Sequence, residues 1–160
     1  MKRLVLCLTT MALFGACENS ADPLGGFLNG GGALTAAQAT GNWRFTLTRT
    51  TTLPCSTPAL ASASVISSRL DVLSDGSVAS TSNWQNPISG VIQALSGSVD
   101  LTNGAVRLTF AASGSAAMEL FPGTMTSSGT VAGTLTDPAA GLSPVFASDG
   151  CQYSVSGVKT

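Results

Sequence analysis

Strict alternation between apolar and polar side chains over Gly41–Arg49 is the feature that most limits how this chain can fold. One side of the segment carries Trp43, Phe45 and Leu47, and the other carries Arg44, Thr46 and Thr48. A period of two residues is typical of a β-strand that buries only one face. The segment is therefore predicted to be such a strand, and later segments of the chain repeat its pattern.

Seven later segments are also predicted to be strands. Charged residues make up only 9% of the chain, and its abundant Ser, Thr, Gly and Ala suit short strands and tight turns better than helices. Asp75-Gly76 and Asn103-Gly104 are hairpin-turn signals between neighbouring segments. We expect an all-β domain of about eight strands, at residues 41–49, 65–73, 77–83, 90–101, 106–110, 116–125, 130–136 and 151–158.

The charged residues of these segments support the assignment. They all fall on the face opposite the apolar residues, and a slip of one residue would exchange the two faces. The residues concerned are Arg44, Arg69, Asp71, Asp100, Arg107 and Glu119. Asp75, Asp137 and Asp149 precede glycine or proline, which is typical of turns. We therefore expect no ionisable group inside the domain.

The first 16 residues are predicted to be an export signal. Lys2 and Arg3 give a basic start, and an apolar stretch from Leu4 to Phe14 follows, too short for a membrane span of about 20 residues. The ending Leu-Phe-Gly-Ala-Cys resembles the lipobox of bacterial lipoproteins. That resemblance implies lipidation of Cys17, loss of residues 1–16, and a membrane as partner. Because Glu18, and not Asp, follows the cysteine, we expect the outer membrane more than the inner one. The alternative is an ordinary cleaved signal with Cys17 as a free thiol.

Residues 17–40 are predicted to be a tether. The Gly-rich run after Cys17 buries little apolar surface, so it should remain flexible with a reach of roughly 25 Å. At its end, Thr35 and Gln38 fit a capping box, which predicts one helical turn before the first strand. The alternative is more linker, since short helices are rarely stable alone. The remaining residues, 41–160, form the predicted β-domain.

Two cysteines remain once Cys7 leaves with the signal and Cys17 carries lipid. Cys55 and Cys151 are then expected to form a disulfide, because exported proteins meet an oxidising compartment. Cys55 follows the first strand and Cys151 opens the last, and these positions are neighbours if the sheet closes into an up-and-down barrel. The bond would close a loop of roughly 100 residues and contribute about 4 to 5 kcal/mol. The alternatives are two free thiols, or a two-sheet β-sandwich whose sheets the cysteines bridge.

The chain resembles the lipocalin (calycin) barrels in four features. These are Gly41-Asn42-Trp43 at the head of the first strand, a helical turn before it, eight strands, and a disulfide to the last strand. The resemblance implies a protein that binds or carries a small apolar ligand inside an antiparallel barrel. The side chains that would line such a cavity are Trp43, Phe45, Leu47, Val106, Leu108 and Phe110. The alternative is that they form a solid core, in a structural or adhesive module of the cell envelope that meets partners through its outer surface.

Other functional classes are less compatible with the sequence. The chain has no histidine, the commonest general base and metal ligand, and its two mature thiols are assigned to a disulfide. We therefore expect no enzyme, no metal and no cofactor. Removing Lys2 and Arg3 from seven basic residues leaves five against eight acidic ones, so nucleic acid is not an expected partner. We expect a monomer.

Overall fold

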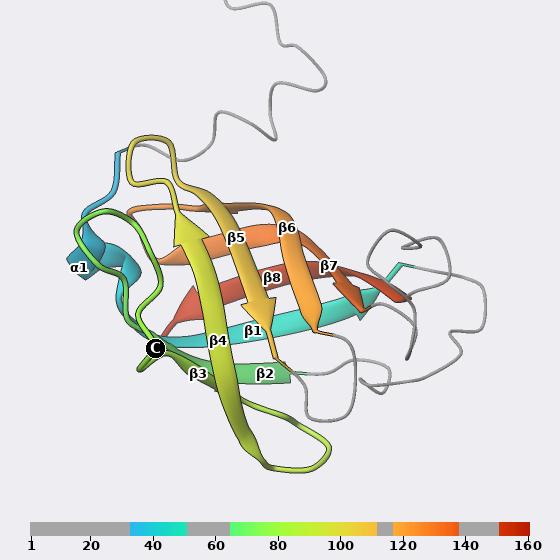
Figure 1. The fold of residues 1–160 in the computed structure, drawn as a ribbon. Helices are drawn as coiled ribbons and strands as arrows, with labels where there is room; N and C mark the ends of the chain where they lie inside the picture. The colour runs from blue at the N-terminus through green and yellow to red at the C-terminus, as the bar shows by residue number, and fades with distance from the viewer. Residues whose placement is uncertain (1–32, 51–64, 112–116, 138–150) are drawn as a thin grey trace, which may run out of the picture.

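The computed structural model describes residues 33–50, 65–111, 117–137 and 151–160. They form one short helix and a closed antiparallel barrel in which each strand pairs with the next and β8 pairs with β1 (Figure 1). The elements are α1 (Ala36–Ala39), β1 (Gly41–Arg49), β2 (Val65–Leu70), β3 (Asn83–Gln85), β4 (Ile92–Val99), β5 (Ala105–Phe110), β6 (Met118–Met125), β7 (Thr130–Asp137) and β8 (Cys151–Lys159). The predicted all-β, eight-stranded, up-and-down barrel is confirmed, and the β-sandwich is not the fold.

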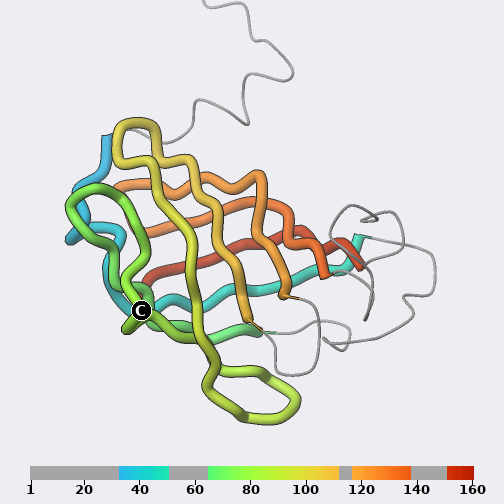
Figure 2. The backbone as a smooth tube through the Cα atoms, in the orientation of Figure 1, coloured from blue at the N-terminus to red at the C-terminus, as the bar shows by residue number. Residues whose placement is uncertain are grey.

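β1 is buried on one face as its alternation predicts. Trp43, Phe45 and Leu47 point inward, and the residues between them face solvent. Phe45 lies opposite Gly157 of β8, where an added Cβ would come within 2.7 Å of the Phe45 ring. The glycine therefore makes room for the ring at the seam where the barrel closes. Figure 2 shows this seam, where the first strand, in cyan, runs beside the last strand, in red.

Aromatic rings cross the interior from β1 to β3. Trp43 stacks on Phe45 with ring centroids 6.3 Å apart, and Phe110 meets the edges of both Phe45, at 6.0 Å, and Trp84, at 5.7 Å. Such pairs contribute about 0.5–1.5 kcal/mol each beyond the area they bury. Ser68 faces inward opposite both tryptophans, so a small side chain separates the two large indoles. We call Trp43, Phe45, Phe110 and Trp84 the aromatic row.

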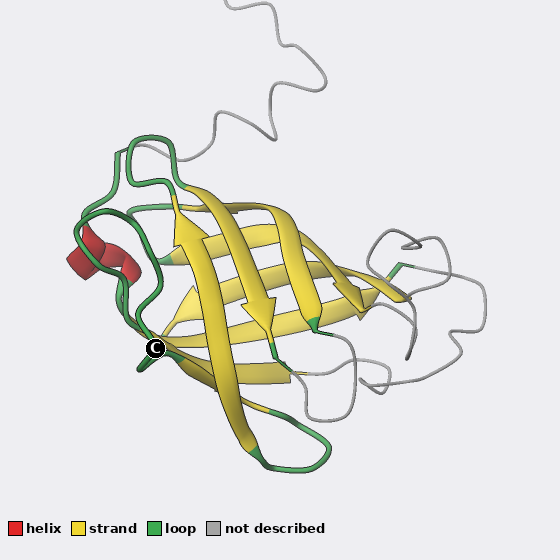
Figure 3. Ribbon diagram, viewed as in Figure 1, coloured by secondary structure: helices red, strands yellow, loops and turns green. Residues whose placement is uncertain are grey.

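α1 covers the end of the barrel where β1 begins and β8 ends, here called the helix end (Figure 3). Both predicted bonds of the capping box are present, with the Gln38 N–H donating to Thr35 Oγ1 and the Thr35 N–H donating to Gln38 Oε1. Lys159 Nζ donates to the carbonyls of Ala37 (3.1 Å) and Gln38 (3.0 Å). Cations favour the carbonyl end of a helix. The helical turn is therefore confirmed and is bonded to both β1 and β8, since the Trp43 indole also donates to Ala39 O.

The third strand differs from the prediction. The segment 77–83 was expected to form it, but the structure has only single bridges at Ser77 and Val78, and β3 begins at Asn83. β2 also ends at Leu70, earlier than predicted. The core position in this region belongs to Trp84, which is fully buried and whose indole N–H donates to Ala111 O at 2.9 Å. The position of the third strand is therefore set by the buried Trp84 side chain and not by the weak alternation of residues 77–83.

A bulge interrupts β6. Phe121 and Pro122 together oppose the single residue Arg107 of β5 and the single residue Thr134 of β7. Proline has no N–H to donate to a ladder, so a proline inside a central strand is accommodated at a bulge. Both bulged side chains point outward, while Leu120 and Gly123 on either side face inward. The bulge therefore adds two exposed side chains to the outer wall.

Replacing Trp84 by alanine should destabilise the fold by about 3–5 kcal/mol, because a fully buried aromatic side chain would leave a cavity in the aromatic row. The matched control is Phe121→Ala, which removes a ring that is 54% exposed and should cost less than about 1 kcal/mol. Urea unfolding measures both values. Equal losses from the two substitutions would contradict the assignment of Trp84 to the core.

Candidate functional site

The six side chains predicted to line a ligand cavity all lie inside the barrel. Each is at most 2% exposed, and three of them, Trp43, Phe45 and Phe110, belong to the aromatic row. The others are Leu47, Val106 and Leu108. The structure therefore brings the predicted residues together, and their rings contact one another. That they line a ligand cavity stays a prediction.

The interior also holds an acid that the sequence did not predict there. Asp137 was expected in a turn, with no ionisable group inside, but it ends β7 and is only 4% exposed. It lies opposite Cys151 in the β7–β8 ladder. The prediction was wrong because the local Asp-Pro pattern says nothing about the neighbouring strand that covers this position once the barrel closes.

Tyr153 lies near Asp137, and the charge of this acid affects the pKa of the Tyr153 hydroxyl. Burial raises the pKa of the Tyr153 hydroxyl, the negative charge of Asp137 raises it further, and Arg49 acts in the opposite direction. Both residues belong to the barrel end opposite α1, where β1 ends and β8 begins. This end therefore combines a buried phenol and a buried carboxyl group beside an otherwise apolar core.

Cys151 takes part in a disulfide bond. Its predicted partner, Cys55, and the predicted lipidation site, Cys17, lie outside the described residues, so both assignments stay predictions. The end of β1 does lie beside the start of β8, because the Thr50 N–H donates to Gln152 O at 2.8 Å. The chain therefore leaves β1 next to Cys151, as the predicted topology requires.

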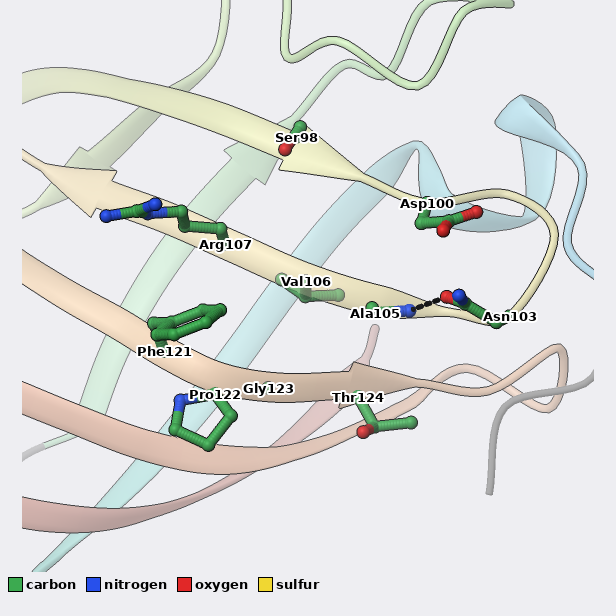
Figure 4. A pocket seen from close by; sticks show the side chains of 10 residues that line it. All are labelled: Ser98, Asp100, Asn103, Ala105, Val106, Arg107, Phe121, Pro122, Gly123 and Thr124. Atoms are coloured by element: carbon green, nitrogen blue, oxygen red, sulfur yellow. Dashed lines mark hydrogen bonds between the residues drawn. The ribbon is translucent and has the colours of Figure 1, made fainter. Parts of the chain in front are cut away.

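A groove lies on the outside of the barrel wall at the β6 bulge. It is formed by residues 98–107 of β4, β5 and their turn, and by residues 121–124 of β6, and its volume is about 320 Å³ (Figure 4). We call it the outer groove. Arg107 and Phe121 lie at one end of it, and Asp100 and Asn103 lie at the other. Small residues, Ala105 and Gly123, lie between the two ends.

The polar groups of the outer groove are held in place by bonds within the protein. Arg107 donates from Nε to Glu119, and its guanidinium lies 5.1 Å from the centre of the Phe121 ring. Asn103 Oδ1 accepts a hydrogen bond from the Ala105 N–H at 2.8 Å. Hydrogen bonds from Thr102 hold the pKa of Asp100 below its usual value, so this carboxyl group is charged at neutral pH. The groove therefore carries ionised groups, and several of its polar atoms already have partners within the protein.

A second hollow of about 330 Å³ lies on the outer face of β1, β2 and β3. Arg44 and Arg69 line it, and Arg69 forms an ion pair with Asp71 at 2.8 Å. Ile92, also on its rim, belongs to a group of exposed aliphatic side chains with Ile88 and Val91 in the β3–β4 hairpin. The predicted outward positions of the strand charges, Arg44 and Arg69 among them, are confirmed.

Sequence reasoning missed both outer hollows, since each depends on side chains from several strands. A partial signal existed for the first. Phe121-Pro122 places a proline within an otherwise regular strand pattern, which indicates a bulge. Within the described ranges, no group of three or more His, Cys, Asp or Glu side chains is placed to hold a metal ion. No helix of these ranges has the length and apolar character needed to span a bilayer.

Tyr153 should ionise above the ordinary tyrosine pKa of 10.0. It is the only tyrosine in the chain, so the near-ultraviolet absorbance of phenolate during alkaline titration reports this residue alone. Because the folded-state pKa is raised, its contribution to the free energy of unfolding is complete below about pH 10 and is lost as the pH rises through the folded-state value. Tyr153→Phe should remove that part of the pH dependence. A midpoint at the ordinary value would contradict the burial of the hydroxyl.

Comparison with known proteins adds no relative. Neither the protein-family models nor the curated proteins nor the solved structures give a match to this chain.

Proposed function

We propose that this protein is a lipid-anchored lipoprotein of the cell envelope whose barrel is a non-catalytic module with a solid interior, acting through its outer surface. The observation that carries the proposal is the aromatic row. Trp43, Phe45, Phe110 and Trp84 contact one another across the interior. An eight-stranded barrel has room for little more than its own side chains or one small ligand, so these rings occupy the space that a carried molecule would need.

The anchor is the second part of the proposal. A lipid on Cys17, at the outer membrane more than the inner, would hold the domain through residues 18–32, and Leu34 is bonded to the helix end by its N–H to Leu101 O. One acyl chain alone binds a protein to a membrane only marginally, whereas several chains on one residue anchor it firmly. The domain would act as a monomer, with the membrane as partner, without nucleic acid and without a cofactor.

The second candidate is a lipocalin-like carrier of a small apolar ligand. A specific observation favours it, since β1 starts with Gly41-Asn42-Trp43 and the Trp43 indole is bonded to a short helix that covers one barrel end. The buried pair Tyr153 and Asp137 would then be polar contacts at the other end. A carrier, however, needs the rings of the aromatic row to separate or to leave space beside them.

A fluorescent fatty-acid probe separates the two candidates. The chain of residues 17–160 carrying Cys17→Ser should show no saturable binding of the probe and no energy transfer from Trp43 and Trp84, the only two tryptophans. Trp84→Ala, which opens the interior, is the matched positive control for a probe that can enter. Saturable binding to the chain with an intact aromatic row, displaced by unlabelled fatty acid, would overturn the solid-core proposal in favour of the carrier.

The anchor is tested in a bacterium with two membranes. The full chain should incorporate labelled palmitate and fractionate with the outer membrane, and Cys17→Ser should abolish both, because the thiol is the acceptor. Cys7→Ser is the control, since Cys7 lies in the predicted signal and should not affect either result. Labelling that persists in Cys17→Ser would contradict the lipobox assignment.

A further inference from the structure

The outer groove has an exposed aromatic ring as its largest surface. Phe121 is 54% exposed. The bulge turns it outward together with Pro122, and the Arg107 guanidinium lies over the ring, 5.1 Å from its centre. The exposed part of this ring offers a flat apolar platform to a ligand.

Hydrogen-bonding groups surround this platform on both ends of the groove. Arg107 uses Nε for Glu119, and its two terminal nitrogens remain as donors. Asp100 accepts from the N–H and hydroxyl of Thr102 through Oδ1, and a carboxylate has about four acceptor positions, so acceptor capacity remains. Ser98 adds a hydroxyl that can donate or accept. The groove thus presents donors at one end and acceptors at the other.

The charges of the groove select against an anionic ligand. The Glu119 carboxylate beside Arg107 neutralises the cation, so an anion would be repelled by the acid as much as attracted by the guanidinium. Asp100 at the other end repels anions as well. A neutral ligand that both donates and accepts hydrogen bonds matches this distribution better than a carboxylate or phosphate group does.

A sugar ring has the required chemistry. Its C–H groups form an apolar face that stacks on an aromatic ring, and its hydroxyls at the edges donate and accept hydrogen bonds in the plane. The groove volume of about 320 Å³ is at the lower end of ligand-sized sites, which suits one or two sugar rings. We propose that the outer groove binds a neutral pyranose unit of a glycan, stacked on Phe121, with hydroxyls bonded to Arg107, Asp100 and Asn103.

This inference deepens the proposed function, because it names the class of partner that the outer surface meets, and it rests on that proposal for the presence of an envelope glycan. The binding itself depends only on the groove. Weak affinity is expected, since the groove is open and a single ring buries little area.

The test follows backbone and indole N–H signals by NMR in the chain of residues 17–160 carrying Cys17→Ser. Chitotetraose, cellotetraose and maltotetraose are each titrated to about 10 mM, at which a millimolar site is mostly filled. At least one of them should shift the signals of Ala105, Gly123 and Thr124 and leave the indole signals of Trp43 and Trp84 unchanged. Added salt should not weaken the binding, because the ligand is neutral.

Phe121→Ala should weaken binding about tenfold or more by removing the platform, and Phe121→Tyr should retain it. Ile92→Ala, another exposed apolar residue outside the groove, is the matched control and should have no effect. Near-ultraviolet circular dichroism verifies that the variants are folded. The proposal is overturned if no oligosaccharide shifts the groove signals, or if Phe121→Ala binds as tightly as the parent chain. A ligand inside the barrel would instead move the two indole signals, so failure of this inference and failure of the solid-core proposal are distinguishable.

Discussion

The pairing of β1 with β8 is the constraint on which the other features depend. Seven residue pairs, from Trp43 with Lys159 to Arg49 with Tyr153, join the first strand to the last, and they turn an open sheet with two unprotected edges into a ring with none. Closure gives all eight strands a common interior, which is why side chains from β1, β3 and β5 meet in the aromatic row. It also places Gly157 against the Phe45 ring, so a small residue at the seam allows the largest core side chains to fit.

The interior and the outer wall of the barrel differ in the side chains that they carry. Inward positions carry mostly rings and aliphatic side chains, and both indole N–H groups donate to backbone carbonyls. The bulge in β6 shifts the register of both ladders that this strand forms, and the outer groove with its exposed Phe121 ring lies there. Irregularity of this kind is frequent beside functional sites because it redirects side chains without altering the rest of the sheet.

Much of the fold was predictable because its signals are local. Alternation identified β1, the Asn103-Gly104 turn separated β4 from β5, and the Thr35 to Gln38 spacing identified α1. The remainder depends on contacts between distant segments. Trp84 lies in a short polar stretch with no alternation, so only the closed barrel reveals it as core. Asp137 is buried by β8, and its local Asp-Pro sequence carries no information about that neighbour. The outer groove exists only where three strands lie side by side. Pro122 indicated only that one of these strands is irregular.

Both ends of the described chain lie at the helix end, and this has a mechanical consequence. Leu34 bonds to Leu101 and Thr160 bonds to Asn42 there, while β1 and β8 run antiparallel from the same end. Traction applied between the two termini would therefore unzip the closing ladder one hydrogen bond after another, the weakest loading geometry for a pair of strands. A tether on the N-terminal side enters the domain through Leu34 and α1, so its pull reaches these contacts before it reaches that ladder.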